Sequence, residues 1–180
     1  MVSIEDADWR EAAREEVLQI SDDLLYTEKT HLHAAERLQK VHQQLGLAMT
    51  VLATAAAATI VGDWNKIAAG LLALAAAILS GILTFMKPEK SAEQHLGAGR
   101  QLGALRVRAR QFLQLDLMRL SVSESREVIA SIVNDKATID AASPGTSGGS
   151  FEAARRRIQS GVYDRDSEPR TLPSSGRRDG

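Results

Sequence analysis

A chain of 180 residues with no cysteine and only 4% aromatic residues excludes a disulfide-stapled scaffold. Its net charge of −1 offers little general attraction to phosphate, so we expect no nucleic-acid partner. The mean hydropathy of −0.17 is that of an ordinary soluble protein, but charged residues, 25% of the chain, are absent from two long segments. The fold class therefore depends on what these two segments form.

The first 21 residues predict a short acidic helix, from roughly Ile4 to Ile20. Its apolar residues recur at helical spacing, and its first turns are acidic. A signal peptide would instead show a basic region and an apolar core, so we expect the first apolar segment to insert into a membrane without one. Ser21-Asp22-Asp23 is a candidate N-cap for a second helix that runs from Leu24 into Leu45 without Gly or Pro.

Two uncharged segments follow, Leu45 to Gly62 and Ile67 to Met86. They contain 18 and 20 residues, and as helices each would be roughly 27–30 Å long, close to the thickness of a bilayer's hydrocarbon core. Only Asp63-Trp64-Asn65-Lys66 separates them, so the second helix must return antiparallel to the first. We therefore predict a two-helix transmembrane hairpin, with spans at about 45–62 and 67–86 and membrane lipid as a partner.

A soluble, Ala-rich helical bundle is the alternative to this hairpin. A helix of a soluble bundle normally carries a polar stripe, which neither segment has. The rest of the chain also contains too little apolar material to enclose both helices. The first segment is the weaker span, because the run Ala55 to Ala58 gains almost no transfer free energy and its threonines cost some. Composition favours the hairpin and leaves the bundle as the alternative.

Small residues gather on one stripe of each apolar helix. The stripes consist of Gly46, Thr50, Thr54 and Ala57 on the first helix, and of Ala69, Ala73, Ala77, Ser80 and Thr84 on the second. In lipid, such stripes let helices approach closely and let hydroxyls bond across the contact. Two roles follow: the stripes close the hairpin on itself, or they join hairpins into a homo-oligomer whose hydroxyls line a narrow pore. No ionisable residue lies within the spans, which argues against a proton relay or an ion-coupled transporter.

The charges beside the two spans predict their orientation. Arg37 and Lys40 precede the first span, Lys87 and Lys90 follow the second, and the connecting loop has only Lys66 beside an aspartate. By the positive-inside rule, the loop lies outside the cell membrane and both termini are cytoplasmic.

After the hairpin, Pro88 suits the first turn of a polar helix that continues to Leu120. The segment 87–120 has seven Lys or Arg against three Asp or Glu, whereas residues 1–44 have five against ten. Opposite charges favour packing of these two cytoplasmic extensions against each other. A solvated, ion-paired face is one use of the basic residues, and contact with anionic lipid is the second. The candidates for lipid contact are Lys87, Lys90, Arg100, Arg106, Arg108 and Arg110.

The last third of the chain predicts short helices and a tail. A helix capped by Ser123 is expected at about 124–136, a Gly- and Ser-rich linker at 143–150, and a short basic helix from Phe151 to Ser160. These helices form a segment at 121–166. Residues 167–180 are rich in Pro, Ser and Arg and are expected to be disordered.

Catalytic signatures are missing from this all-α pattern, so we expect no enzyme. The sequence has no cysteine nucleophile, no nucleophile elbow, no phosphate loop and no His-Glu-x-x-His. Glu28-x-x-His31 has the spacing of a di-iron ligand pair but occurs once, so no metal or cofactor is expected. Gly99 and Gly103 follow no strand, and their four-residue spacing instead indicates close helix packing or a bend.

The order of these residues resembles a known family, the SLATT domains. The resemblance covers about residues 22–120 and extends loosely to 121–166. It rests on Leu24-Leu25-Tyr26, Glu28, His31, Ala34-Ala35, His42, the small-residue hairpin, Phe85-Met86-Lys87-Pro88-Glu89-Lys90 and His95. SLATT domains are two-transmembrane effectors associated with second-messenger nucleotide synthetases (SMODS) and nucleotide-sensing SLOG domains. The resemblance implies a membrane effector of bacterial antiviral defence that forms pores and causes cell suicide, with a synthetase or sensor as partner. A non-catalytic membrane adaptor and the soluble bundle remain the alternatives.

Overall fold

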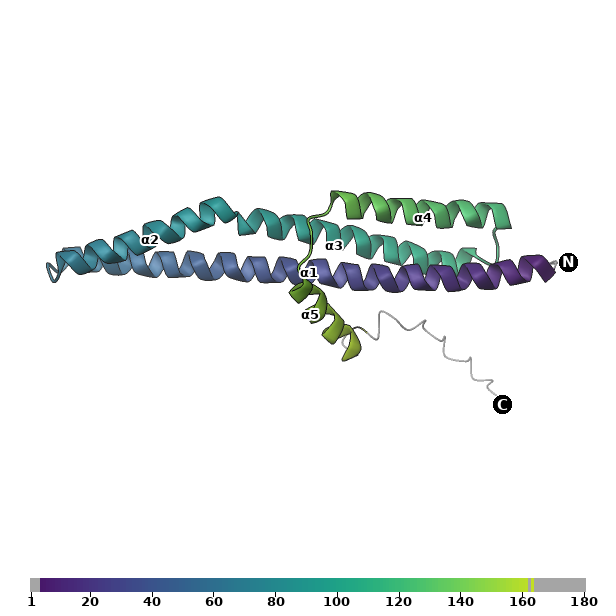
Figure 1. The fold of residues 1–180 in the computed structure, drawn as a ribbon, viewed down its shortest axis with the longest axis horizontal. Coiled ribbons are helices and arrows are strands. Elements are labelled where there is room, and N and C mark those ends of the chain that lie inside the picture. The colour runs from purple at the N-terminus through teal and green to yellow at the C-terminus, as the bar shows by residue number, and fades with distance from the viewer. Residues whose placement is uncertain (1–3, 162, 164–180) are drawn as a thin grey trace, which may run out of the picture.

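The computed structural model describes residues 4–161 and 163, and every regular element in them is helical. The order is α1 (Ile4–Val61), α2 (Lys66–Met86), α3 (Pro88–Gln111), the π-helical turn η1 (Phe112–Asp116), α4 (Val122–Ala142) and α5 (Gly148–Gln159). Figure 1 shows an elongated molecule with α1 as its axis, α2 and α3 returning beside it, and α4 and α5 added along the half that contains the N-terminus. The all-α prediction is confirmed. The tail expected at 167–180 lies outside the described residues.

Helix α1 is continuous for 58 residues, roughly 87 Å at 1.5 Å per residue. The helix start expected at Ser21 is therefore wrong. Ala13, Val17 and Leu24 are all buried in one core with residues of α3, and this shared packing keeps the backbone helical through the possible cap. Local capping propensity is worth about 1 kcal/mol, less than burying two or three apolar side chains.

The hairpin turn is compact and has a defined cap. The Asn65 side chain accepts hydrogen bonds from the backbone N–H groups of Ile67 and Ala68, at 3.0 and 3.1 Å, and so begins α2. Asp63 adopts the left-handed conformation with φ of 49°. The two expected spans are confirmed as helical segments, and Figure 1 shows α2 lying antiparallel to the last part of α1.

A single residue separates α2 from α3. Lys87 is left-handed, with φ of 44°, and Pro88 opens α3 at its first turn as the sequence predicts. The chain then continues along α1, so α3 packs beside the N-terminal part of α1. Beyond the apolar hairpin, α1 and α3 therefore form a polar helix pair. A Cβ at Gly99 would lie 2.9 Å from Leu32 Cδ2, which shows that α3 approaches α1 closely at this glycine, as its spacing indicated.

The core of the polar half lies between α1, α3, η1 and α4. Its fully buried side chains include Val17, Leu24, Leu102, Phe112 and Ile132. Leu117 donates its backbone N–H to the Phe112 carbonyl at 2.9 Å, which widens the end of α3 into a π turn. Arg10 of α1 donates to the Leu117 and Leu120 carbonyls, satisfying acceptors that the end of the helix leaves open.

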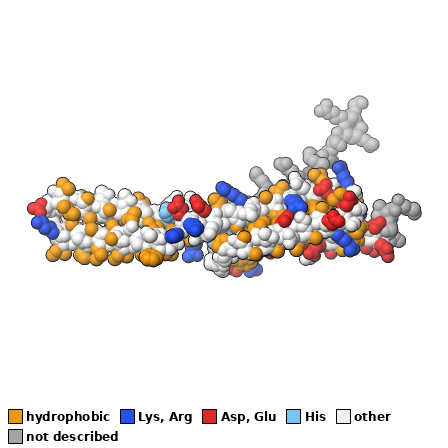
Figure 2. All heavy atoms as spheres, turned by 90° about the horizontal axis from the view of Figure 1, so that it is seen from above, with side chains coloured by type: hydrophobic (Ala, Val, Ile, Leu, Met, Phe, Trp, Pro, Cys, Tyr) orange, Lys and Arg blue, Asp and Glu red, His pale blue; other side chains and the backbone are white. Residues whose placement is uncertain are grey.

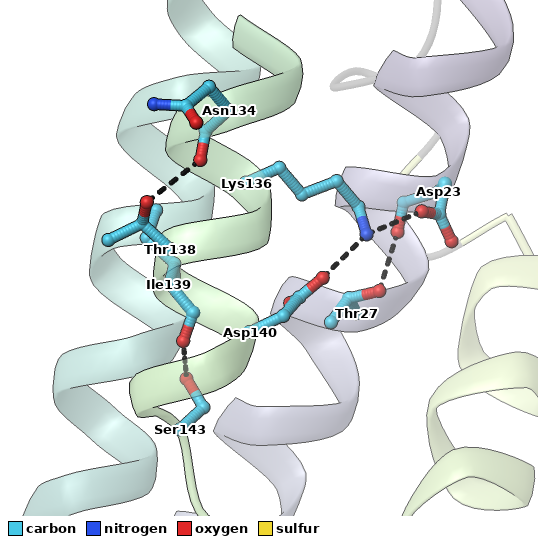
Figure 3. Close-up of polar contacts among 8 residues, drawn as sticks. All are labelled: Asp23, Thr27, Asn134, Lys136, Thr138, Ile139, Asp140 and Ser143. Atoms are coloured by element: carbon cyan, nitrogen blue, oxygen red, sulfur yellow. Dashed lines mark hydrogen bonds and ion pairs between the residues drawn. The ribbon is translucent and has the colours of Figure 1, made fainter.

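Helix α4 begins two residues earlier than expected and extends to Ala142. Its cap is Ser121 rather than Ser123: Ser121 Oγ accepts from Glu124 N–H, and Glu124 Oε2 accepts from Ser121 N–H at 2.9 Å. Ser121 Oγ also donates to Glu124 Oε2 at 2.6 Å, and this hydrogen bond, together with the one from Ser121 N–H, lowers the pKa of Glu124. Figure 3 shows how α4 is tied to α1, with Lys136 Nζ 2.7 Å from Asp140 Oδ2 and 2.9 Å from Asp23 Oδ2.

Helix α5 begins inside the segment expected to be a linker. Ser147 caps it by accepting from Ser150 N–H at 3.3 Å, so Gly148 and Gly149 form its first turn. Ser150 and Ala154 are buried in the contact with α1. Local capping by Ser147 and this contact outweigh the low helix propensity of the two glycines.

Candidate functional site

The hairpin exposes its apolar side chains instead of burying them. In the most apolar 18-residue windows of the two arms, only 6% and 11% of the residues are buried. Large side chains on its outer surface include Ile67, Leu71 and Phe85, which are 77%, 63% and 90% exposed. Figure 2 shows this half covered by hydrophobic side chains, with charges only at its tip and from its base onward. A core helix of a soluble bundle would be mostly buried, so this surface requires an apolar surrounding.

The two arms meet along a seam with alternating three- and four-residue spacing. The covered positions at this spacing are Leu45, Met49, Leu52, Ala56 and Thr59 on α1, and Ala69, Leu72, Ala76, Leu79 and Leu83 on α2. Gly46, Ala55, Ala68, Ala75 and Gly81 beside them are partly covered as well. Ala56, Ala69 and Ala76 are the most buried of them. This is the spacing of a coiled-coil seam, in which small residues let the helices approach closely.

The small stripes that the sequence singled out lie mostly outside this seam. Ala69 is in the seam, and Gly46 is half-buried. All the others are exposed: Thr50, Thr54, Ala57, Ala73, Ala77, Ser80 and Thr84. These exposed stripes therefore do not close the hairpin on itself. Their role in contacts between copies remains a prediction.

The threonine hydroxyls of the stripes donate hydrogen bonds within their own helix. Thr50, Thr54 and Thr84 each donate to the backbone carbonyl four residues earlier, at 2.8–2.9 Å. Such bonding lets a hydroxyl lie in an apolar phase without a partner on another helix. The oxygen lone pairs remain as acceptors on the outer surface of the hairpin.

The basic candidates divide into two groups along the long axis. Lys87 and Lys90 are exposed at the base of the hairpin, whereas Arg106 lies 19 residues beyond Lys87, roughly 28 Å along α3. Arg106 and Arg108 instead contact other helices: Arg108 Nη1 is 2.7 Å from Asp135 Oδ2 on α4. Arg100 and Arg110 are exposed on α3. Of these six candidates, Lys87 and Lys90 lie nearest the spans, where contact with anionic lipid remains a prediction.

A buried polar layer joins α1 to α3 in the extramembrane half. Glu28, which is 6% exposed, accepts from Arg106 Nε at 3.0 Å and from Lys29 Nζ at 2.8 Å. A Cβ at Gly103 would lie 3.3 Å from the Glu28 carboxyl carbon, so the glycine makes room for this carboxylate. The sequence did not predict this layer. The only signal for it was the three-residue spacing of Glu28 and His31, which places both side chains on one side of a helix.

Two histidines continue the polar layer toward the hairpin. His31 Nδ1 and His95 Nδ1 are 3.0 Å apart, and both rings are buried. Burial lowers the pKa of both; the neighbouring His95 lowers that of His31 further, while Asp140 opposes the change. The pair therefore shares a single hydrogen bond between neutral rings. Within the described residues, no group of three or more His, Asp or Glu side chains is placed to hold a metal ion.

These features define a class: a helical membrane protein with a two-span hairpin whose arms continue into a polar helical body. The family model described as SMODS and SLOG-associating 2TM effector domain family 4 matches residues 14–162. The chain belongs to this family, as the sequence resemblance indicated. No curated protein and no solved structure matches the chain.

Proposed function

We propose that this protein is a non-catalytic membrane effector of a bacterial defence system triggered by a nucleotide second messenger. Two observations support it: membership in a family of two-transmembrane effector domains, and a hairpin whose apolar surface faces outward. The family description connects such domains with SMODS and SLOG proteins. A nucleotide synthetase or nucleotide sensor of that kind is the partner we expect to control this chain.

The proposed action is permeabilisation of the cell membrane by a homo-oligomer, leading to cell suicide. The exposed stripe on α2, formed by Ala73, Ala77, Ser80 and Thr84, supports this proposal because the hairpin seam does not use it. Small side chains on a free helical face favour close contact with another helix in lipid. Thr50 and Ser80 are our candidates for lining the pore. Both termini are proposed to lie in the cytoplasm, where the polar body would meet its partner.

The experiment compares substitutions on two exposed faces of α2. Ala73→Leu and Ala77→Leu enlarge the stripe and should abolish permeabilisation, measured as dye uptake and membrane depolarisation in cells overproducing each variant. Leu74→Ile and Ile78→Leu change large exposed residues on the side of α2 away from the seam and should permeabilise like the unmodified chain. Membrane levels are measured in parallel. Equal permeabilisation by both sets of variants would reject this packing face.

The alternative function is a membrane adaptor that recruits partners through its extramembrane helices. The buried polar layer and the tight contact at Gly99 give this half a defined structure of its own, as an adaptor would need. An adaptor would leave cells intact at every expression level, even with the cognate nucleotide system present. That result would replace the effector proposal.

A further inference from the structure

A basic pocket lies where α5 packs against α1, at the base of the hairpin. It has a volume of about 290 Å³. Its lining consists of His33, Glu36, Arg37, Lys40, Val41 and Gln44 of α1 and Arg157 of α5. The first span begins at Leu45, directly after the last of these residues on α1. The pocket is on neither the small-residue stripes nor the polar layer described above.

The pocket has more positive charge than its acidic residue can balance. Glu36 Oε2 lies 3.7 Å from Arg157 Nη1 and 3.9 Å from His33 Nδ1. Among the described residues, neither Arg37 nor Lys40 forms an ion pair. Three cations thus face one carboxylate, and two positive charges remain open to an anion.

The positive charge of the pocket also affects the pKa of His33. Burial lowers its pKa, and the charges of Arg157 and Lys40 lower it further, while Glu36 opposes the change. The imidazole is therefore neutral near pH 7. Its Nε2 atom is buried and has no hydrogen-bond partner among the described residues. A buried polar atom without a partner is uncommon in folded proteins and requires an explanation such as an absent ligand or water.

The position of the pocket identifies the source of the anion. Lys40 precedes Leu45 by five residues, roughly 7.5 Å along the helix axis. The headgroup layer extends about 5–7 Å beyond each side of the hydrocarbon core. Lys40 thus lies at the outer edge of this layer, and Arg37 lies about one helical turn further out. Their long side chains must extend toward the membrane to reach lipid phosphates, which Arg and Lys are suited to bind.

We propose that the pocket of Arg37, Lys40 and Arg157 binds the phosphodiester of an anionic phospholipid. The guanidinium of Arg37 and the ammonium of Lys40 contact the phosphate oxygens, and Arg157 carries α5 to the same headgroup. Lipid binding thereby fixes α5 against α1 at the membrane surface. The proposal requires only a hairpin in a bilayer, so it holds for an effector and for an adaptor alike.

The test uses the full chain in phosphatidylcholine nanodiscs and phosphatidylglycerol as the probe. Retention of phosphatidylglycerol is measured by native mass spectrometry for the unmodified chain and for the double variant Arg37→Gln, Lys40→Gln. At about 1 kcal/mol for each basic residue near the lipid surface, the variant should retain this lipid at least about tenfold less strongly. The matched control is Lys87→Gln, Lys90→Gln, which removes the same charge at the same end of the hairpin. These exposed lysines attract anionic lipid but do not line the pocket that would retain a headgroup, so this variant should lose clearly less phosphatidylglycerol than the pocket variant.

Two results would overturn the proposal. Equal losses in both double variants would show that anionic lipid is attracted by the surface charge in general. Binding of inorganic phosphate or glycerol phosphate to the chain in phosphatidylcholine nanodiscs, without any preference for phosphatidylglycerol, would show that the ligand is a soluble phosphate.

A second measurement uses only the unmodified chain, so it does not depend on whether a variant folds. Imidazole chemical shifts of His33 are followed across pH in nanodiscs with and without phosphatidylglycerol. A bound headgroup offsets the positive charges of Arg157 and Lys40, so the pKa of His33 should rise when the lipid is present. An unchanged pKa of His33 would contradict occupation of the pocket.

Discussion

Among single residues, Glu28 and Arg106 form a largely buried ion pair between α1 and α3. Their side chains are only 9% and 13% exposed. Both charges have lost most of their hydration, and each is stabilised by the opposite charge of its partner. Lys29 gives Glu28 a second partner at 2.8 Å. The ion pair of Glu28 and Arg106 joins two residues that are 78 positions apart in the chain. It therefore helps to fix the register of α3 along α1 next to the hairpin.

Replacing Arg106 should therefore destabilise the extramembrane half strongly. Arg106→Leu leaves the Glu28 carboxylate buried with less compensation, and the free energy of unfolding should fall by about 3 kcal/mol. Arg108→Leu is the control, because its partner Asp135 is about half exposed and the loss should be about 0.5 kcal/mol. Helicity during denaturant unfolding in detergent micelles measures both. Similar losses in the two variants would show that the Glu28 layer is no more important than a surface pair.

The histidine pair predicts a loss of stability in mild acid. Burial holds the pKa of His31 and His95 below the ordinary value of 6.5 in the folded chain. The unfolded chain therefore takes up protons first as the pH falls below about 6.5, and the folded state loses stability from there down to the lowered values. The midpoint of thermal unfolding should fall between about pH 7 and about pH 5.

The variant His95→Gln should weaken this dependence on pH, because one buried titrating ring is gone. His42→Gln, at a partly exposed ring on α1, should preserve it. A midpoint that does not change with pH in the unmodified chain would mean that the pair is solvated and titrates as in water.

The sequence could predict some of these residues and not others. The spacing of Gly99 and Gly103 indicated close packing, and Leu32 and Glu28 are indeed the residues that a Cβ would meet there. Pairing of Arg106 with Glu28 could not be predicted, since opposite net charges on two segments do not set the register between them. The sequence alone therefore leaves Arg106 among the candidates for lipid contact, although α3 places it roughly 28 Å from Lys87.

At the scale of elements, the hairpin seam determines how the two spans pack. Equal distances from the turn place Leu52 level with Ala76, and Ala56 level with Leu72, so large residues alternate with small ones across the contact. The sequence does not reveal this seam, because apolar residues cover every face of a membrane helix and hydropathy does not mark the face that packs. The two spans themselves were predictable from length and lack of charge.

A larger side chain in the seam should weaken the hairpin. Ala76→Leu inserts three carbon atoms between the arms and should lower the free energy of unfolding by about 1–3 kcal/mol. Ala77→Leu, one position further on the exposed face, should leave the isolated hairpin as stable as before. Thermal unfolding of both variants in micelles, followed by circular dichroism, measures the difference. A more stable Ala76→Leu variant would mean that the arms are separated by unfilled space.

In the whole molecule, an apolar half and a polar half share one long axis. One helix of 58 residues belongs to both halves, whereas the other side of the molecule is interrupted at the left-handed Lys87, between α2 and α3. Family membership and the exposed apolar surface both require that one half lies in the membrane.

Labelling of single cysteines in intact cells tests this arrangement most directly, because the natural chain contains no cysteine. Trp64→Cys places a thiol at the exposed turn without removing the Asn65 cap, and Glu127→Cys places one on the exposed side of α4. An impermeant thiol reagent should label the turn in intact cells and label α4 only after lysis. Labelling of α4 but not the turn in intact cells, or recovery of both variants in the soluble fraction without detergent, would contradict a hairpin that spans the membrane with both termini in the cytoplasm.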